Sequence, residues 1–361
     1  MNKPPKKDFT RRLVQWYHIH KRDLPWRQTT DPYVVWLSEI ILQQTRVEQG
    51  QPYFQRFIES FPKIEKLASA PQDKVMRLWQ GLGYYSRARN LHATAKTIVE
   101  TYGGRFPKSY PEILKLPGVG PYTAAAIASF SYGLPYAVVD GNVNRVLSRV
   151  FGITDPIDTP IAKKRIQELA DSVLDKNDPA THNQAIMEFG ALHCKPINPD
   201  CPSCIFKDIC QANHRGLVSE IPAKAKKTKI TTRYFNYLVI HDNGNTLIRK
   251  RNEPGIWHNL FEPPMVESPK PLTLQKFQAT SIWKTICQDP KAEVVQVQDR
   301  KPHKLSHQTI YARIYFVNCR LNPEAFTDGP YLRVGKNRLR QYAVPRLIEQ
   351  VFQEQIPGYG K

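Results

Sequence analysis

The sequence predicts a mainly helical domain that contains a helix-hairpin-helix motif, followed by a smaller α+β domain. Three observations support this prediction: a Gly-rich hairpin between two short helical patterns, a formal net charge of +20, and a change to β-rich sequence after residue 230. A length of 361 residues makes two domains the natural expectation. The excess of basic residues points to a polyanionic partner, with nucleic acid as the first candidate. No run of about 18 apolar residues occurs, so no helical membrane span is expected.

The hairpin lies within residues 110–130. Gly118 and Gly120 flank Val119, which suits a tight turn because glycine accepts positive φ. Pro121 can then open the second helix at its first position, where no backbone N–H is needed. Such a hairpin presents backbone N–H groups and a helix N-terminus to a DNA phosphate. An ordinary turn between two helices is the alternative interpretation.

The N-terminal region predicts an amphipathic helix over residues 8–20, followed by a loop. Pro25 breaks the helical pattern and places Trp26 between Arg22 and Arg27. An aromatic surface beside guanidinium groups suits a base that is turned out of a DNA helix. A tryptophan that only packs two helices together is the alternative.

The next predicted helix covers residues 33–45, with Asp31 as its N-cap. It is apolar on nearly every side and carries one carboxyl group, Glu39. Burial disfavours the charged form of a carboxyl and raises its pKa, which suits a general acid at neutral pH. The alternative is that Glu39 lies on a solvent-facing stripe with Ser38 and Gln43.

Residues 47–98 continue as helices with one break at residues 81–87. This break combines two glycines with Leu82, two tyrosines including Tyr84, and a basic residue. The combination is typical of a loop that wedges into a base stack. A helix-helix turn with core tyrosines is the alternative.

Asp140 follows an apolar run and precedes a helical pattern, so it is predicted as a helix N-cap. A carboxylate so close to a phosphate-binding hairpin suggests chemistry on DNA, whereas a purely capping role is the alternative. Three further helices are predicted over residues 143–151, 162–174 and 182–193.

Four cysteines follow in a C-x6-C-x2-C-x5-C pattern. Thiolates this close in sequence can hold zinc or a four-iron cluster, although structural zinc sites more often use two C-x2-C pairs with a longer spacer. The spacing alone leaves both metals open. The cysteines are Cys194, Cys201, Cys204 and Cys210.

A basic linker is predicted at residues 222–230, before a separate α+β domain at 231–361. Its predicted elements are two strands around a hairpin turn, a later strand and a closing amphipathic helix. The first two strands cover residues 233–241 and 246–250, with the turn at 242–245. The later strand covers residues 311–319, and the helix covers residues 343–352.

Taken in this order, the motifs resemble the MutY family of adenine DNA glycosylases, within the endonuclease III superfamily, over almost the whole chain. The resemblance depends on the motifs at residues 23–27, 38–45, 81–87, 116–123 and 139–142 and on the four cysteines. It implies a helix-hairpin-helix DNA glycosylase with an iron-sulfur cluster loop and a C-terminal MutT-like, or Nudix-like, domain. The helical domain would cover residues 1–221, with a six-helix lobe at about 31–140 and a cluster lobe formed by 1–30 and 141–221.

The resemblance also implies the activity, which is removal of adenine mispaired with 8-oxoguanine or guanine from double-stranded DNA in base excision repair. Glu39 would protonate adenine N7, and Asp140 would stabilise the sugar cation or bond to it transiently. Asn142 and Tyr122 would position the carboxylate and the sugar. The further DNA contacts fall into an adenine pocket, a duplex wedge and the phosphate hairpin. They are Arg22, Leu24, Trp26, Arg27 and Gln184; Gln44, Thr45, Leu82 and Tyr84; and Gly118, Val119 and Gly120.

The same resemblance implies one 4Fe–4S cluster on the four cysteines and a lesion-reading role for the C-terminal domain. Residues 255–263 are similar to the start of a Nudix segment, but the acidic core that holds magnesium is absent downstream, so pyrophosphatase activity is not expected. The family's Phe-Ser-His loop is replaced by Leu305-Ser306-His307, so Ser306 and His307 are the candidate contacts to 8-oxoguanine. Cys287 and Cys319 are expected to be free thiols.

Two alternatives remain. An endonuclease III-like glycosylase/lyase for oxidised pyrimidines would need a lysine where this chain has Tyr122. A non-catalytic helix-hairpin-helix DNA-binding protein would need no pair of carboxyl groups. We expect a monomer in the bacterial cytoplasm, at the nucleoid, with replication or repair clamp proteins as candidate partners.

Overall fold

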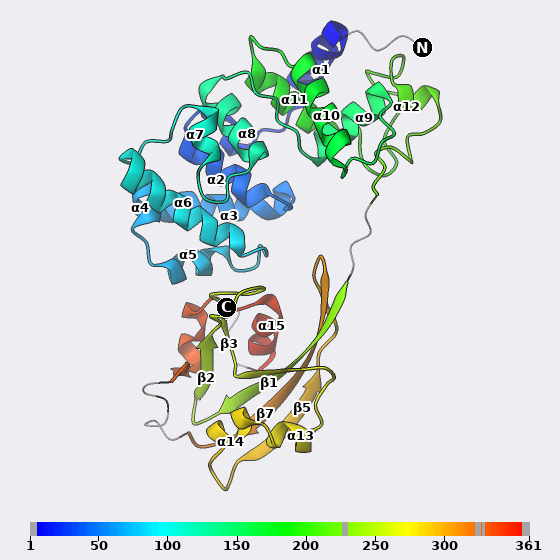
Figure 1. Ribbon diagram of the computed structural model, residues 1–361. Coiled ribbons are helices and arrows are strands. Elements are labelled where there is room, and N and C mark those ends of the chain that lie inside the picture. The colour runs from blue at the N-terminus through cyan, green and yellow to red at the C-terminus, as the bar shows by residue number, and fades with distance from the viewer. Residues whose placement is uncertain (1–5, 226–229, 322–325, 327–328, 356–361) are drawn as a thin grey trace. The chain divides into compact units, whose positions relative to one another are not determined.

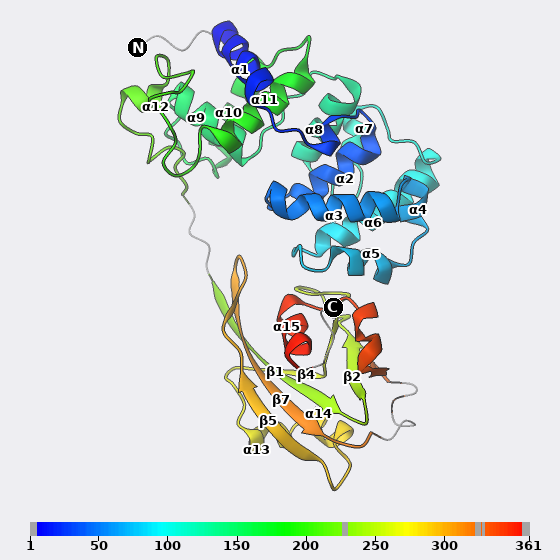
Figure 2. The same ribbon diagram turned by 180° about the vertical axis from the view of Figure 1, so that it is seen from behind.

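The computed structural model describes residues 6–225, 230–321, 326 and 329–355 (Figures 1 and 2). The predicted linker, residues 222–230, lies partly outside this range. The chain forms two compact units, which are described separately. The first contains residues 1–69 and 90–226, and the second contains residues 70–89 and 227–361. Residues 70–89, which the sequence analysis placed in the helical domain, thus group with the C-terminal part of the chain.

The first unit is helical. Its elements are α1 (Lys6–His20), η1 (Pro25–Arg27), α2 (Pro32–Leu42), α3 (Val47–Ser60), α4 (Ile64–Ala68), most of α6 (Ser86–Tyr102), α7 (Tyr110–Leu114), α8 (Pro121–Tyr132), α9 (Gly141–Phe151), α10 (Pro160–Val173), α11 (Pro179–Leu192) and α12 (Gln211–His214). The helices predicted from periodicity are present, with ends that differ by a few residues.

The largest core of this unit joins the start of the chain to its later helices. Phe9 of α1 stacks on Phe206 at 4.7 Å between ring centroids, and both rings are fully buried. The same apolar cluster includes residues of α9, α10 and α11 and two of the motif cysteines, Cys194 and Cys210. The cysteine loop is therefore part of the core that α1 covers.

The helix-hairpin-helix forms as the glycine pattern predicts. Gly118 has φ of +71°, and a Cβ added there would lie 2.5 Å from the side chain of Asn90 in α6. A larger residue would therefore meet both backbone strain and a clash. Pro121 occupies the first turn of α8, whose N-cap is Gly120.

The second unit contains α5 (Gln72–Trp79) and an α+β fold. Its strands are β1 (Thr231–His241), β2 (Asn245–Lys250), β3 (Phe261–Glu262), β4 (Met265–Ser268), β5 (Glu293–Asp299), β6 (His303–Lys304), β7 (Gln308–Asn318) and β8 (Tyr331–Gly335). Its other helices are α13 (Leu274–Gln278), α14 (Ser281–Ile286), η3 (Lys336–Gln341) and α15 (Arg346–Gln355).

The strands form two sheets. One has the order β4-β1-β7-β5 with β6 also paired to β7, and the other has the order β3-β2-β8. β1 and β7 pair in parallel along their whole length, from Thr231 opposite Gln308 to His241 opposite Asn318. Helices α13 and α14 lie on one side of the larger sheet and α15 lies on the other (Figures 1 and 2).

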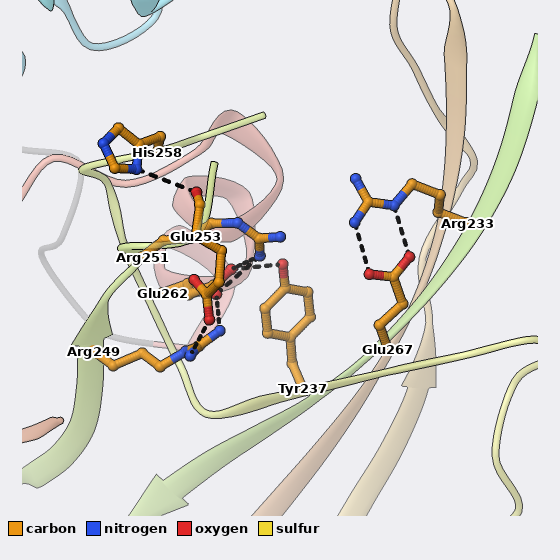
Figure 3. Close-up of polar contacts among 8 residues, drawn as sticks. All are labelled: Arg233, Tyr237, Arg249, Arg251, Glu253, His258, Glu262 and Glu267. Atoms are coloured by element: carbon orange, nitrogen blue, oxygen red, sulfur yellow. Dashed lines mark hydrogen bonds and ion pairs between the residues drawn. The ribbon is translucent and has the colours of Figure 1, made fainter. Parts of the chain in front are cut away.

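A buried polar cluster connects the two sheets. Glu262 of β3 is fully buried and accepts hydrogen bonds from Arg249 at 3.0 Å, Arg251 at 3.0 Å and Tyr237 at 3.2 Å (Figure 3). Since β1 supplies the tyrosine and the chain around β2 supplies the arginines, the carboxylate links β1 to the smaller sheet. A carboxylate buried with these partners is compensated in charge and in hydrogen bonding.

Among the described residues, no helix is both long and apolar enough to cross a membrane.

Candidate active site

A cavity of about 1040 Å³ opens in the first unit. Its walls come from η1, from α2, and from the starts of α8 and α9 together with α11. Thirteen of the predicted site residues line it: Arg22, Leu24, Trp26, Arg27, Glu39, Gln44, Thr45, Gly118, Gly120, Tyr122, Asp140, Asn142 and Gln184. The fold thus brings together residues that are separated by more than 160 positions in the sequence.

Glu39 lies in the middle of α2 and is only 8% exposed. The alternative in which it occupies a solvent-facing stripe is therefore wrong, because the neighbouring Ser38 is buried too. The hydroxyl of Tyr122 donates a hydrogen bond to Glu39 Oε2 at 2.7 Å. Burial raises the pKa of Glu39 to about 7; the Tyr122 hydrogen bond opposes this rise, and the charge of Asp140 adds to it. The carboxyl group is consequently poised to hold a proton near neutral pH.

Asp140 is the N-cap of α9, as predicted. Its Oδ1 accepts from the backbone N–H of Val143 at 2.7 Å, and its Oδ2 accepts from Asn142 Nδ2 at 2.8 Å. Burial raises the pKa of Asp140, while these hydrogen bonds and the nearby Arg145 favour the ionised form. The helix N-terminus acts in the same direction as the hydrogen bonds. Glu39 and Asp140 therefore differ in environment: Tyr122 donates one hydrogen bond to Glu39, and several donors surround Asp140.

One wall of the cavity contains an acidic residue that the sequence analysis did not assign to the site. Glu188 of α11 is 1% exposed and accepts hydrogen bonds from Arg22 at 2.8 Å and from Arg27 at 2.7 Å. Burial alone would raise the pKa of Glu188, but the bonds and charges of the two arginines lower it to about 2. Its position one helical turn after Gln184 was the available sequence signal.

The same wall fixes two further predicted contacts. Gln184 Oε1 accepts a hydrogen bond from the hydroxyl of Tyr17 at 2.7 Å. Trp26 packs edge-on against Phe54 at 5.1 Å and is mostly buried, yet it lines the cavity. Trp26 therefore combines the packing role and the cavity-lining position that the sequence left as alternatives.

Gln44 and Thr45 follow the end of α2. The helix stops at Leu42, earlier than the predicted residue 45, because Gln43 leaves the helical conformation and Gln44 takes φ of 54°. A left-handed conformation is uncommon for glutamine and occurs preferentially at functional turns. Val119 of the hairpin is buried and, unlike its two glycine neighbours, is not among the cavity-lining residues.

Two of the predicted wedge residues, Leu82 and Tyr84, lie in the second unit with the predicted lesion-reading residues, whereas Gln44 and Thr45 lie in the first. Tyr84 has φ of 48°, its side chain is exposed, and its hydroxyl is hydrogen-bonded to Ser306 Oγ. Ser306 and His307 form the exposed turn between β6 and β7, whereas Leu82 is buried. The structure thus joins Tyr84 to the turn between β6 and β7.

The four motif cysteines lie between α11 and α12, and the last of them, Cys210, is the N-cap of α12. Arg149 Nη1 donates to Cys194 Sγ at 3.5 Å, and the backbone N–H of Phe206 donates to Cys204 Sγ at 3.4 Å. Burial raises the pKa of Cys204 to about 12, so deprotonation there calls for a bound cation. Within the described part of the chain, no three His, Cys, Asp or Glu side chains converge closely enough to hold a single metal ion.

Comparisons with known proteins show which class of protein this chain belongs to. The HhH-GPD superfamily of base excision DNA repair proteins matches residues 37–178, and the NUDIX domain matches residues 236–354. The chain is similar to the structure of a thermostable thymine-DNA glycosylase, with 30% identity and a TM-score of 0.55 over 58% of this chain and 97% of that one. An endonuclease III–DNA complex shares the fold at 22% identity, with a TM-score of 0.51 over 59% of this chain and 98% of that one. The fold and the site therefore define a helix-hairpin-helix base excision repair protein with a C-terminal Nudix-like domain.

The relatives narrow this class to one family. An adenine DNA glycosylase of Buchnera aphidicola subsp. Baizongia pistaciae (strain Bp) is 37% identical over 311 residues, which cover 84% of each protein. The adenine DNA glycosylase of Homo sapiens is 42% identical over 217 residues, covering 57% of this chain and 40% of that protein. This chain belongs to the MutY family of adenine DNA glycosylases, as its motifs predicted.

Proposed function

We propose that this protein is an adenine DNA glycosylase of base excision repair that hydrolyses the N-glycosidic bond of adenine opposite 8-oxoguanine, and also opposite guanine, in double-stranded DNA. One observation supports it most directly: a buried carboxyl group with a pKa of about 7, Glu39, shares a cavity with a second carboxylate, Asp140. Such a pair can supply a proton to a leaving base and a negative charge to the cation that remains.

Glu39 acts as the general acid. A target adenine reaches the cavity only after rotation out of the duplex. Transfer of the Glu39 proton to adenine N7 draws electrons from the glycosidic bond, which breaks with its electron pair going to the base. Because the pKa of Glu39 is about 7, a large fraction of the enzyme carries this proton near neutral pH. General acid catalysis of this kind contributes ~10²–10⁴-fold to a rate.

Asp140 stabilises the oxocarbenium-like sugar that the departing base leaves behind. The bonds from Val143 and Asn142 hold the carboxylate at the start of α9. The carboxylate either offsets the positive charge at C1′ or bonds to C1′ transiently, as in retaining glycosidases. Water then adds to C1′ and loses a proton, which leaves an abasic site and free adenine.

Strand cleavage is not part of this reaction. A glycosylase/lyase forms a Schiff base through a lysine amine, and the position after the hairpin is occupied here by Tyr122. Its hydroxyl is engaged with Glu39, and burial raises the pKa of Tyr122 well above its ordinary value. Tyr122 therefore serves to orient the acid, and the enzyme is monofunctional.

The four cysteines hold a 4Fe–4S cluster. The resemblance to the MutY family supports this assignment, because the C-x6-C-x2-C-x5-C spacing is the one that the family uses for such a cluster. Arg149 and the backbone N–H of Phe206 donate to two of the sulfur atoms, which suits thiolate ligands. The cluster would stabilise the loop over residues 194–210; the acid chemistry is assigned to the cavity residues.

The C-terminal unit distinguishes the opposite base. Adenine in a normal A:T pair is identical to adenine in a mispair, so the information must come from the other strand. Ser306 and His307 are exposed polar residues in a turn that Tyr84 also reaches, which suits contacts to a base edge and insertion beside it.

A single-turnover assay on an A:8-oxoguanine duplex tests the proposal, with T:8-oxoguanine and undamaged A:T duplexes as controls. We expect adenine release from the mispair, with strand breakage only after added alkali. Release of an oxidised pyrimidine with spontaneous strand cleavage would support the lyase alternative instead. DNA binding without base release would support a non-catalytic protein.

A further inference from the structure

Within the second unit, the loop that carries Tyr84 is attached to residues 227–361 at several points. This loop, residues 81–87, connects α5 to α6 and belongs with residues 227–361 in one compact unit. We define residues 81–87 as the wedge loop and the β6–β7 turn with Ser306 as the reading turn.

Gln80, the residue directly before the wedge loop, makes a two-sided contact with the end of the chain. Its Nε2 donates to Glu349 Oε1 of α15 at 2.8 Å, and its Oε1 accepts from the backbone N–H of Val344 at 3.2 Å. Both ends of the amide are therefore used, which fixes its orientation. Gln80 is 8% exposed, so the loss of either partner would remove a hydrogen bond from a largely buried site.

Contacts beyond both ends of the wedge loop support the same attachment. In α5, Asp73 pairs with Lys250 of β2 at 2.6 Å. At the start of α6, Arg89 donates to the backbone carbonyl of His258 at 2.9 Å. The loop is thus held to the C-terminal part of the unit on the α5 side and on the α6 side.

The acceptor of Arg89 lies in a segment that the buried polar cluster of this unit supports. His258 Nδ1 is 3.2 Å from the carbonyl oxygen of Glu253, and Glu253 pairs with Arg249, which also bonds to Glu262 (Figure 3). Because Glu262 is fully buried, these bonds connect the Arg89 contact to the centre of the domain. The attachment is therefore to a fixed part of the fold.

We infer that Gln80 is a positioning residue for lesion discrimination: it holds the wedge loop on the C-terminal unit so that Tyr84 and the reading turn meet the same base step together. This inference rests on the proposed function. Gln80 itself need not touch DNA. If the wedge loop moves independently of the reading turn, the enzyme can still excise adenine but loses part of its preference for 8-oxoguanine on the opposite strand.

The test exchanges the amide of Gln80 and the carboxylate of Glu349 between the two positions. Gln80→Glu places a carboxylate against the Glu349 carboxylate and should release the loop. Adding Glu349→Gln restores a donor opposite the new carboxylate, whose other oxygen can still accept from Val344. The measured quantity is the ratio of single-turnover rates on A:8-oxoguanine and A:G duplexes, together with hydrogen exchange of residues 81–87.

We expect Gln80→Glu to lower this ratio about tenfold, since small misplacements of positioning elements cost up to about 10²-fold. The A:G rate should stay within about twofold, and exchange of the wedge loop should become faster. The double variant should return to within about twofold of the wild-type ratio. A wild-type ratio in folded Gln80→Glu, or a double variant as impaired as the single one, would overturn the inference.

Two variants of α15 keep the test decisive if Gln80→Glu does not fold. Glu349→Leu removes the acceptor of Gln80 without adding a charge and should lower the ratio about threefold or more. Arg346→Leu is the matched control, because Arg346 pairs with Glu349 on the same helix and is largely exposed. An unchanged ratio in Glu349→Leu, or an equal fall in Arg346→Leu, would refute the role of Gln80. A wild-type enzyme that excises adenine without any preference for 8-oxoguanine would instead refute the proposed reading of the opposite base, and the role of Gln80 with it.

Discussion

Replacement of Glu39 by glutamine should inactivate the enzyme and, above pH 7, make it more stable. The side chain keeps its shape and can still accept the hydrogen bond of Tyr122. The glutamine side chain cannot carry a transferable proton. It also removes the free-energy cost of burying a charged carboxylate within α2. The stability effect depends on pH, because the pKa of Glu39 is raised from 4.5 to about 7 by burial.

The sign follows from proton linkage. Between about pH 4.5 and 7 the folded protein binds more protons at Glu39 than the unfolded chain does, so wild-type stability falls as the pH rises through this window. At about 1.36 kcal/mol per pH unit, the displacement from 4.5 to about 7 corresponds to about 3 kcal/mol. The difference in unfolding free energy between Glu39→Gln and wild type should therefore be small near pH 5 and favour the variant by about 2–3 kcal/mol at pH 8.5.

Urea titrations at the two pH values, followed by tryptophan fluorescence, measure this difference. Glu59→Gln, on the exposed side of α3, is the matched control for the loss of one glutamate carboxyl group. Single-turnover rates on A:8-oxoguanine should fall in wild type as the pH rises above about 7, and Glu39→Gln should lose ~10²–10⁴-fold at all pH values. A stability difference that does not change with pH would refute the buried-acid argument, whatever the loss of activity.

Three further predictions concern the cavity and the cysteines. Asp140→Asn removes the charge that offsets the sugar cation and should lower the single-turnover rate by more than tenfold with mismatch binding retained; full activity would contradict the assignment. Tyr122→Lys should allow borohydride to trap the enzyme on DNA, whereas wild type should give little adduct; efficient trapping of wild type would favour the lyase alternative. Purified protein should contain about four iron and four sulfide per fully loaded chain, and stoichiometric zinc in anaerobically prepared protein would refute the cluster.

The sequence predicted most of what local patterns determine. Asp140 was recognisable as an N-cap because an aspartate between an apolar run and a helical pattern has few other roles, and the hairpin followed from Gly118 and Pro121. The buried state of Glu39 was one of two interpretations, because an apolar helix with one carboxyl group does not itself say which face meets solvent.

Contacts between distant segments were not predictable in this way. Nothing in residues 70–89 indicates that they group with strands more than 140 positions later, because the contacts that hold Gln80 and Arg89 are single polar bonds without periodicity. Glu188 was missed for the same reason. Its role depends on hydrogen bonds from Arg22 and Arg27, which lie more than 160 positions earlier in the sequence. The short strands β3 and β6 have only two residues each and leave no period to detect.

The cavity contains two glutamates whose pKa values are displaced in opposite directions. This contrast distinguishes the proposed acid, Glu39, from a residue that holds the cavity wall in place, Glu188. Glu39 has a pKa of about 7 and carries the proton, whereas Glu188 has a pKa of about 2 and stays ionised between Arg22 and Arg27. For Glu188 the linkage has the opposite sign: its contribution is present above the unfolded pKa of 4.5 and is lost as the pH falls towards about 2. Glu188→Gln should therefore destabilise the protein at pH 7 by about 3 kcal/mol, since it leaves two arginines without their shared carboxylate.

Replacement of Glu188 should impair substrate binding as well as stability. Arg22 and Arg27 line the cavity in which we propose that adenine binds, and without Glu188 both guanidinium groups lose the carboxylate that holds them. Glu188→Gln should weaken binding of the extruded base more than it slows the chemical step, so KM should rise while the single-turnover rate at saturation changes little. Urea unfolding at pH 7 measures the loss of stability, and the concentration dependence of the single-turnover rate separates weaker binding from a slower chemical step. If Glu188→Gln instead shifted the pH at which the rate falls, Glu188 would be acting on the proton of Glu39, and the division of roles between the two glutamates would be wrong.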